Sequence, residues 1–229
     1  MNITLPDGSV RDLKPGSTGQ DLANDIGPGL AKAAIAVSVN GIQKDLSDPI
    51  NEDSEVSIIT LDSEDGLEIM RHTLTAQVLA RAVQNLYPGT KLAIGPTIKD
   101  GFYYDFEFKK PISPDDLERI EKEMTKIINS KSSITKKLYS KKDAIAVFKS
   151  KKETYKESII EESDQSDNFQ LYYQDDNEFV DLCRGPHLPS LKHIGSFKLT
   201  KLAGAYWKGD SKNKMLTRIY GTAWKNDKD

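Results

Sequence analysis

A long periodic stretch between residues 67 and 86 constrains the fold more than any other part of the chain. Its apolar residues recur at steps of three and four, the spacing of one face of an α-helix. Pro88 and Gly89 follow directly and end the pattern. The stretch predicts a long helix with one buried stripe, formed by Leu67, Met70, Leu74, Val78, Leu79, Ala82, Val83 and Leu86.

The segments after this helix alternate between helix and strand patterns. Residues 91–108 are typical of a hairpin that turns at Lys99-Asp100-Gly101. Helices are predicted over residues 113–128 and from Ser140 onward. This order predicts an α+β domain with the long helix packed on an antiparallel sheet. Short strands are expected at residues 171–173, 179–182 and 197–199.

The first 61 residues make a separate unit by pattern. The pattern predicts two short strands, a helix capped by Thr18, a hairpin turning at Asn40-Gly41 and a strand at residues 54–60, in that order. This order suits a ubiquitin-like β-grasp fold. Residues 61–66 are polar and end in glycine, which is typical of a boundary. We therefore predict a β-grasp domain over residues 1–61 and an α+β domain over residues 62–229.

The composition indicates a soluble globular protein. Hydrophobic residues make up 37% of the chain and charged residues 29%. No run approaches the ~20 apolar residues of a membrane span, and the N-terminus lacks the basic and apolar regions of a signal peptide. The chain has one cysteine, which cannot form an internal disulfide, so a cytoplasmic location is expected.

The charges are segregated along the chain although the net charge is only −3. Residues 122–156 carry eleven lysines and three acids, and residues 157–178 carry eight acids and no Lys or Arg. Residues 181–218 return to eight Lys or Arg against two acids. Two basic blocks around an acidic one indicate a localised polyanion-binding face or, alternatively, solvated helix surfaces.

The stretch VDLCRGPHLP holds the single cysteine, Cys183, and His187 four residues later. Gly185 and Pro186 exclude a regular helix there, so both side chains belong to a loop in which they could converge. Asp181 stands two residues before Cys183 on the same face of a predicted strand. The spacing alone leaves two readings open: half of a reactive or metal-binding site, or a buried thiol beside an incidental imidazole.

Ten residues after His187, a second motif begins with the residues FKLT. The segment KLAGAYWKGDSKNKMLTRIYGTAW interleaves basic and aromatic residues. This pattern suits the end of an RNA strand, because aromatic rings stack on bases while lysines meet phosphates.

Three stretches together resemble the N-terminal region of bacterial threonyl-tRNA synthetases: KLAIGPTIKDGFYYDFEF, VDLCRGPHLP and the basic-aromatic segment. They look like the second domain of that family, an editing domain shared in form with alanyl-tRNA synthetases. Residues 1–61 are similar to its first domain, the TGS module. The resemblance implies an N-terminal fragment of a class II enzyme without its aminoacylation core. No cofactor is implied for this region, since ATP, magnesium, zinc and the homodimer contacts would belong to that core.

The resemblance also implies a reaction. The editing domains of this family hydrolyse serine that is wrongly esterified to threonine tRNA. Such proofreading is needed because a pocket for threonine gains only ~1–3 kcal/mol from the methyl group that serine lacks. The implied partners are the acceptor end of tRNA(Thr) and seryl-tRNA(Thr). Water attack on the ester requires a positioned water, proton transfer and stabilisation of the oxyanion.

By resemblance, the catalytic residues are His72, Lys156, Asp181, Cys183 and His187. Lys156 and His187 would order the water or transfer a proton. Asp181 would orient the substrate amine or a neighbouring base. Cys183 would bound the pocket without acting as a nucleophile.

The sequence departs from the family on the long helix, where the family has His-x-x-x-His. Here His72 matches the first position and Gln77 the second, so one residue is extra. At ~100° per residue the two differ by ~140° in an α-helix and cannot share a face, whereas Thr73 and Gln77 would. Either the extra residue is absorbed at the helix start or His72 turns away. We predict that Thr73, Gln77 and Tyr104 contact the substrate.

Glutamine can only hydrogen-bond, so a four-ligand metal site of the alanyl type is not expected and no metal is predicted. Three hypotheses remain. The chain could be a deacylase, a tRNA-binding appendage with a degenerate editing site, or a free-standing editing factor.

Overall fold

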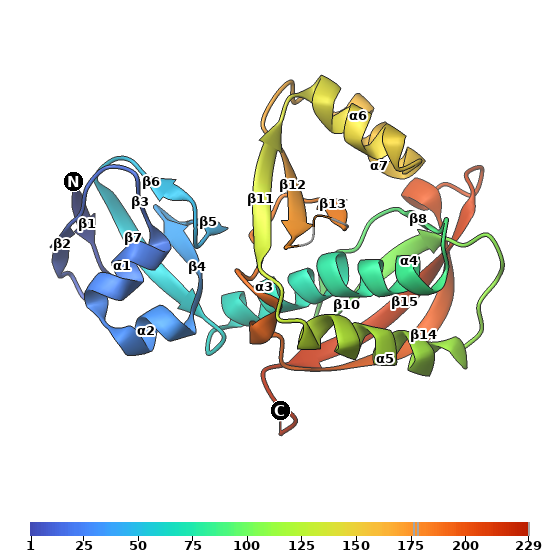
Figure 1. The fold of residues 1–229 in the computed structure, drawn as a ribbon, viewed down its shortest axis with the longest axis horizontal. Coiled ribbons are helices and arrows are strands. Elements are labelled where there is room, and N and C mark those ends of the chain that lie inside the picture. The colour runs from blue at the N-terminus through green and yellow to red at the C-terminus, as the bar shows by residue number, and fades with distance from the viewer. Residues whose placement is uncertain (176, 178, 229) are drawn as a thin grey trace.

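The structure, a computed structural model, describes residues 1–175, 177 and 179–228. Asp176 and Glu178 of the acidic block and Asp229 lie outside the described residues. A small N-terminal domain, drawn in blue, stands beside a larger one that contains the rest of the chain (Figure 1). Strand β7 ends at Thr60 and helix α3 begins at Glu64, and we propose residue 61 as the boundary. No helix among the described residues is long and apolar enough to cross a membrane.

The N-terminal domain is a five-stranded sheet with helices on one side. The strand order is β2-β1-β7-β4-β5, and β1 runs parallel to β7. These strands are β1 (Asn2–Thr4), β2 (Val10–Asp12), β4 (Ala34–Val39), β5 (Ile42–Asp45) and β7 (Ser54–Thr60). The other elements are α1 (Gly19–Ile26), α2 (Pro28–Ala33), β3 (Ser17–Thr18) and β6 (Pro49–Ile50).

The predicted order of two strands, a helix, a hairpin and a further strand is confirmed, including the cap of α1. The Thr18 hydroxyl accepts from the backbone N–H of Asp21, and the Asp21 carboxylate accepts from the N–H of Thr18. This capping box satisfies two N–H groups that the first helical turn leaves unpaired. The short helix α2 and the pair β3–β6 were not predicted, because two to six residues are too few to show a period.

The larger domain is built on an antiparallel sheet of order β14-β15-β10-β8, with β9 paired to β10. The long helix and α5 lie across one face of this sheet (Figure 1). Its core continues into the first domain through Ile35, Ala36 and Ile59. The elements are β8 (Lys91–Leu92), β9 (Thr97–Ile98), β10 (Gly101–Glu107), α5 (Asp116–Asn129), β14 (Ser196–Tyr206) and β15 (Met215–Trp224).

A smaller lobe of the same domain has its own sheet and core. Its strands have the order β11-β12-β13, and two helices pack against them (Figure 1). The elements are β11 (Ile134–Tyr139), α6 (Lys141–Ser150), α7 (Thr154–Glu162), β12 (Phe169–Gln174) and β13 (Val180–Leu182). Helix α7 was not predicted, although it carries Lys156, because its apolar residues form no continuous stripe.

The long helix differs from its prediction at its centre. It consists of α3 (Glu64–Thr73), a π-helical segment η1 (Leu74–Leu79) and α4 (Ala80–Leu86). The N–H of Ala80 bonds the carbonyl of Thr75, five residues earlier. All six η1 residues are buried, so the prediction of a single buried stripe was wrong here. A π-segment accommodates one additional residue in a helix, so the extra residue is absorbed at the helix centre rather than at its start.

The capping box of α1 gives a test of the fold. Replacing Thr18 with alanine removes one acceptor, and we expect the free energy of unfolding to fall by about 1 kcal/mol. Urea unfolding followed by circular dichroism measures the change. Ser47→Ala, at an exposed position of the same domain, serves as the control, and equal stability of the two variants would contradict the assigned cap.

Candidate active site

A cavity of about 630 Å³ lies where the long helix, the large sheet and the smaller lobe meet. Five of the residues predicted as functional line it, and they come from α3, β10, α7, β13 and the loop after β13. Apolar and backbone groups around Ile94, Gly95 and Pro96 complete the opposite wall. The five predicted residues on its wall are His72, Tyr104, Lys156, Asp181 and Cys183.

A buried ion pair forms one side of the cavity. The ammonium of Lys156, 3% exposed, lies 2.8 Å from Oδ1 of Asp181, which is 1% exposed. The hydroxyl of Tyr104 donates to Oδ2 of Asp181 at 2.9 Å, and the N–H of Leu182 donates to Oδ1. A buried carboxylate is tolerated only with such partners. The pair therefore holds a cation at a fixed place beside the cavity.

Two imidazoles and the thiol form the neighbouring side. Nε2 of His72 lies 2.7 Å from Sγ of Cys183. The rings of His72 and His187 are stacked, with centroids 4.7 Å apart and an angle of 3° between their planes. His72 faces the cavity, whereas His187 is buried behind it and does not line the cavity. The structure thus decides that His72 does not turn away.

The hydrogen bonds of Thr73 fix the tautomer of His187. The Thr73 hydroxyl donates its proton to the carbonyl of Ile69 at 2.9 Å. Its oxygen accepts from the N–H of Leu188, so it can only accept from Nδ1 of His187, 3.0 Å away. Nδ1 of His187 therefore carries the proton, and Nε2 holds a free lone pair. That Nε2 atom is buried without a hydrogen-bond partner.

Burial keeps the groups of the site uncharged apart from the ion pair. Burial lowers the pKa of His72, and the charge of Asp181 opposes this only in part. Burial, followed by the neighbouring His72, lowers the pKa of His187 well below its usual range. Burial raises the pKa of the Cys183 thiol to about 12. The thiol is thus protonated near neutral pH, and its sulfur lies beside Nε2 of a neutral His72.

Glycine at position 185 is required by the shape of the motif loop. Gly185 has φ +67°, and a Cβ atom there would stand 2.0 Å from the hydroxyl oxygen of Tyr172. The N–H of Gly185 donates to Sγ of Cys183 at 3.2 Å. The ring of Tyr172 meets that of His187 edge-on, with centroids 4.4 Å apart. The Gly-Pro bend therefore brings Cys183 and His187 to the same place, as the sequence indicated.

The structure does not place Thr73 and Gln77 where a substrate would reach them. Both are fully buried, and the Thr73 hydroxyl is hydrogen-bonded to Nδ1 of His187. Gln77 bonds Gln174 through its carbonyl and side-chain oxygens. Ala76, four residues after His72, lines the cavity instead. The predicted substrate contacts of Thr73 and Gln77 are not supported, because both side chains are buried in the core.

His72, Cys183 and His187 also offer three atoms of metal-ligating type within 4.8 Å of one another. Around a tetrahedral zinc ion, a nitrogen at roughly 2.0 Å and a sulfur at roughly 2.3 Å stand about 3.5 Å apart. The 2.7 Å separation of His72 Nε2 and Cys183 Sγ is too short for that. A ligating cysteine must also be a thiolate. The three side chains as placed are not spaced as ligands of a tetrahedral zinc ion.

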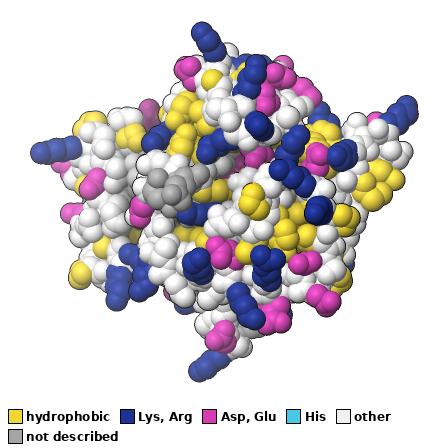
Figure 2. Space-filling model, turned by 45° about the vertical axis from the view of Figure 1, so that its right-hand side comes forward, with side chains coloured by type: hydrophobic (Ala, Val, Ile, Leu, Met, Phe, Trp, Pro, Cys, Tyr) yellow, Lys and Arg dark blue, Asp and Glu magenta, His cyan; other side chains and the backbone are white. Residues whose placement is uncertain are grey.

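The basic blocks do not form one uniform surface. On the face shown in Figure 2, Lys and Arg side chains are interspersed with Asp and Glu. Several basic side chains of the second block pair with acids: Lys198 with Glu121, Lys208 with Glu162, Lys214 with Glu107 and Arg218 with Asp105.

One basic residue that was not singled out from the sequence lies at the cavity. Arg184, between Cys183 and Gly185, is exposed and lines the cavity. An exposed guanidinium at the edge of a cavity is suited to binding a phosphate. The sequence signal that could have identified Arg184 is its position inside the VDLCRGPHLP motif.

Comparison with known families agrees with both domains. The TGS domain model matches residues 1–60, and the model for the threonyl and alanyl tRNA synthetase second additional domain matches residues 170–220. The chain contains a TGS domain followed by an editing-type second additional domain. The earlier resemblance to the N-terminal region of threonyl-tRNA synthetases is thereby confirmed.

Curated relatives extend the similarity over the whole chain. It is 52% identical to a threonine–tRNA ligase of Rhodospirillum rubrum over 227 residues and 51% identical to one of Acidithiobacillus ferrooxidans over 228. It is 47% identical to one of Prochlorococcus marinus over 227 residues. These matches cover 99–100% of this chain but 35% of each relative. The matched part is N-terminal in these proteins.

The protonated state of Cys183 gives a test of the site. Only the thiolate reacts with iodoacetamide, and a pKa of about 12 against an ordinary 9.0 makes its fraction near pH 8 roughly 1000-fold smaller in the folded chain. We expect alkylation at pH 8 to be at least 100-fold slower in the native protein than in urea. Because Cys183 is the one cysteine, total labelling measured by mass spectrometry reports it alone, and comparable rates in both states would contradict the assignment.

Proposed function

We propose that this chain hydrolyses the ester of seryl-tRNA(Thr), as the proofreading part of a threonine–tRNA ligase. The observation that carries the proposal is that a buried cation and an uncharged imidazole face one cavity. Lys156, held by Asp181, supplies the cation, and His72 supplies the imidazole. The cavity belongs to a domain of the editing type.

The proposed reaction is attack of water on the ester carbonyl. His72 takes a proton from the water on Nδ1, while its Nε2–H is directed at the sulfur of Cys183, because a neutral imidazole is able to act as a base. The Lys156 ammonium stabilises the negative charge that develops on the carbonyl oxygen. The bond between the carbonyl carbon and the ribose oxygen then breaks, and the proton passes from His72 to that leaving oxygen. The products are serine and tRNA with a free hydroxyl group.

The remaining residues hold these two groups in place. Asp181 pairs with the Lys156 ammonium and is itself bonded by the Tyr104 hydroxyl, so the two residues hold Lys156 in place. The Lys156 ammonium also lies 5.5 Å from the Tyr104 ring centre. Cys183 lies against Nε2 of His72 and is not the nucleophile, since its thiol is protonated. His187 supports the ring of His72 by stacking. Its role thus shifts from handling the water directly to supporting His72.

The acceptor end of tRNA(Thr) is the proposed partner. We place its terminal phosphates at Arg184, because this exposed side chain stands at the cavity. Binding of tRNA and any dimer contacts of a complete ligase are part of the same proposal.

One observation favours a second candidate function. Ala76 occupies the cavity position four residues after His72, where the family has a second histidine, so the site has a single imidazole on its wall. Absence of the second histidine is what a tRNA-binding appendage that does not hydrolyse the ester would show. It predicts micromolar, salt-sensitive binding of tRNA and no release of serine.

A deacylation assay separates the two. We expect the chain to release serine from seryl-tRNA(Thr) in single-turnover reactions, and His72→Ala to lower that rate by at least about 100-fold, the contribution of a general base. Lys156→Met should lower it at least as strongly, because it also leaves Asp181 buried and unpaired. Lys142→Met, at an exposed lysine of α6, is the matched control and should keep the parental rate.

Circular dichroism spectra of all variants establish that they are folded. Absence of serine release by the parent above the blank at high protein concentration would refute the deacylase and leave the appendage. Parental rates in His72→Ala would refute the role of the imidazole.

A further inference from the structure

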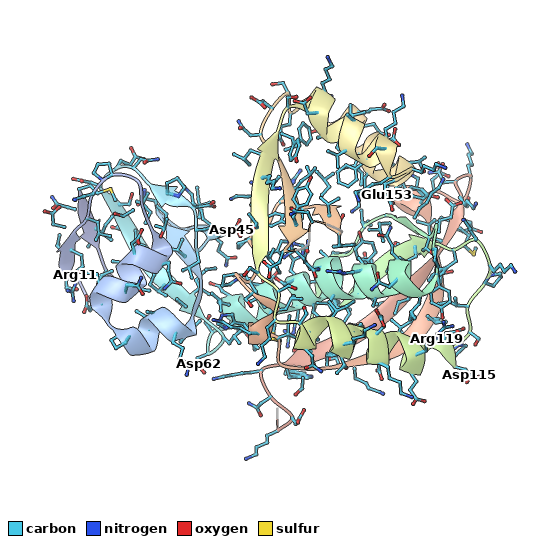
Figure 3. All side chains as sticks on the ribbon, in the orientation of Figure 1. Arg11, Asp45, Asp62, Asp115, Arg119 and Glu153 are labelled. Atoms are coloured by element: carbon cyan, nitrogen blue, oxygen red, sulfur yellow. The ribbon has the colours of Figure 1, made fainter. Side chains whose placement is uncertain are left out.

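Asp45 brings the β-grasp domain into the candidate active site. It is the last residue of β5, on the side of the first domain that faces β11 and β12 (Figure 3). Only 6% of the residue is exposed. A carboxylate buried at a domain boundary requires partners, and those of Asp45 lie in the second domain.

Two of these partners surround His187. Oδ1 of Asp45 accepts the backbone N–H of His187 at 2.8 Å. Oδ2 accepts the hydroxyl of Tyr172 at 2.8 Å, and the Tyr172 ring packs edge-on against the His187 ring. One carboxylate thus fixes the backbone of His187 and the aromatic ring beside its imidazole.

The third partner supplies the balancing charge. Nζ of Lys136, on β11, lies 3.0 Å from Oδ2 of Asp45 and donates to Oδ2 of Asp48 at 2.7 Å. Burial lowers the pKa of Lys136, but the hydrogen bonds and charges of Asp48 and Asp45 outweigh burial and hold it above its ordinary value. The lysine is therefore charged, and its ammonium balances the negative charge of the Asp45 carboxylate.

The contacts continue from His187 to the cavity. The Nδ1 proton of His187 is held by Thr73, and its ring is stacked on the ring of His72. His72 is the imidazole on the cavity wall. A displacement of the His187 backbone would move the ring that supports His72.

We propose that Asp45 is a positioning residue of the editing site, so that the β-grasp domain forms part of that site's supporting structure. Asp45 touches neither the cavity nor the reacting atoms and acts through His187 and Tyr172. This inference rests on the proposed deacylation for its catalytic consequence. Its structural half, the orientation of His187 by a residue of the other domain, is independent of any activity.

The test compares three substitutions in the full chain. Asp45→Ala removes all three contacts, and Asp45→Asn keeps an acceptor for the His187 N–H but loses the charge. Asp48→Asn is the matched control, because Asp48 shares Lys136 with Asp45. We expect single-turnover deacylation at saturating protein to fall at least 10-fold in Asp45→Ala, less in Asp45→Asn, and less than 2-fold in Asp48→Asn. The protein concentration giving half-maximal rate should not change, since the tRNA contacts are intact.

A second readout does not need activity. The amide proton resonance of His187 in ¹H–¹⁵N spectra should move upfield in Asp45→Ala, which lacks the charged acceptor, and stay in place in Asp48→Asn. The β-grasp resonances distant from Asp45 report whether that domain remains folded. If the parent lacks deacylase activity while the His187 resonance moves as expected, the proposed function fails and the positioning contact stands.

Two results would overturn the inference. One is an unchanged His187 amide resonance in Asp45→Ala. The other is a folded Asp45→Ala variant that deacylates at the parental rate.

Discussion

The carboxylate of Asp181 is the contact on which the candidate site depends. It joins the smaller lobe to the large sheet, because it bonds Lys156 of α7 on one side and Tyr104 of β10 on the other. Its own strand, β13, contributes the third bond through the N–H of Leu182. Removing water from a carboxylate and an ammonium costs several kcal/mol each, which the fold recovers only through such a complete set of partners. The hydrogen bond from Tyr104 to this carboxylate therefore ties the smaller lobe to the large sheet beside the cavity.

Part of this arrangement was accessible from the sequence. The capping box at Thr18, the hairpin at Lys99-Asp100-Gly101 and the loop at Gly185 follow from local chemistry and were predicted correctly. The residues on the cavity wall came from family resemblance, since nothing in the local pattern around Lys156 distinguishes it from the ten other lysines of residues 122–156. Its burial results from tertiary packing of α7, which shows no continuous apolar stripe.

The contacts that sequence reasoning missed are all between distant segments. Asp45 and His187 are 142 residues apart, and no spacing rule connects them. In the sequence, nothing distinguishes Asp45 from the other acidic residues of the first domain. Its contacts form only when β5 packs against the second domain in the folded chain. The shared core of Ile35, Ala36 and Ile59 with the second domain makes the same point. The two domains are distinct in sequence pattern, yet buried hydrophobic residues of both form one continuous core at their interface.

The π-segment η1 has a consequence for comparing this chain with its relatives. Because Leu74–Leu79 holds one additional residue within the helix, the faces of α3 before it and of α4 after it keep their packing against the sheet and α5. Relative to the His-x-x-x-His spacing of the family, the additional residue therefore lies inside a helix, not in a loop. A gap placed instead at the start of the helix would shift His72 and the other residues of α3 onto the wrong counterparts. Transfer of functional roles along this helix has to follow the side chains that face the cavity.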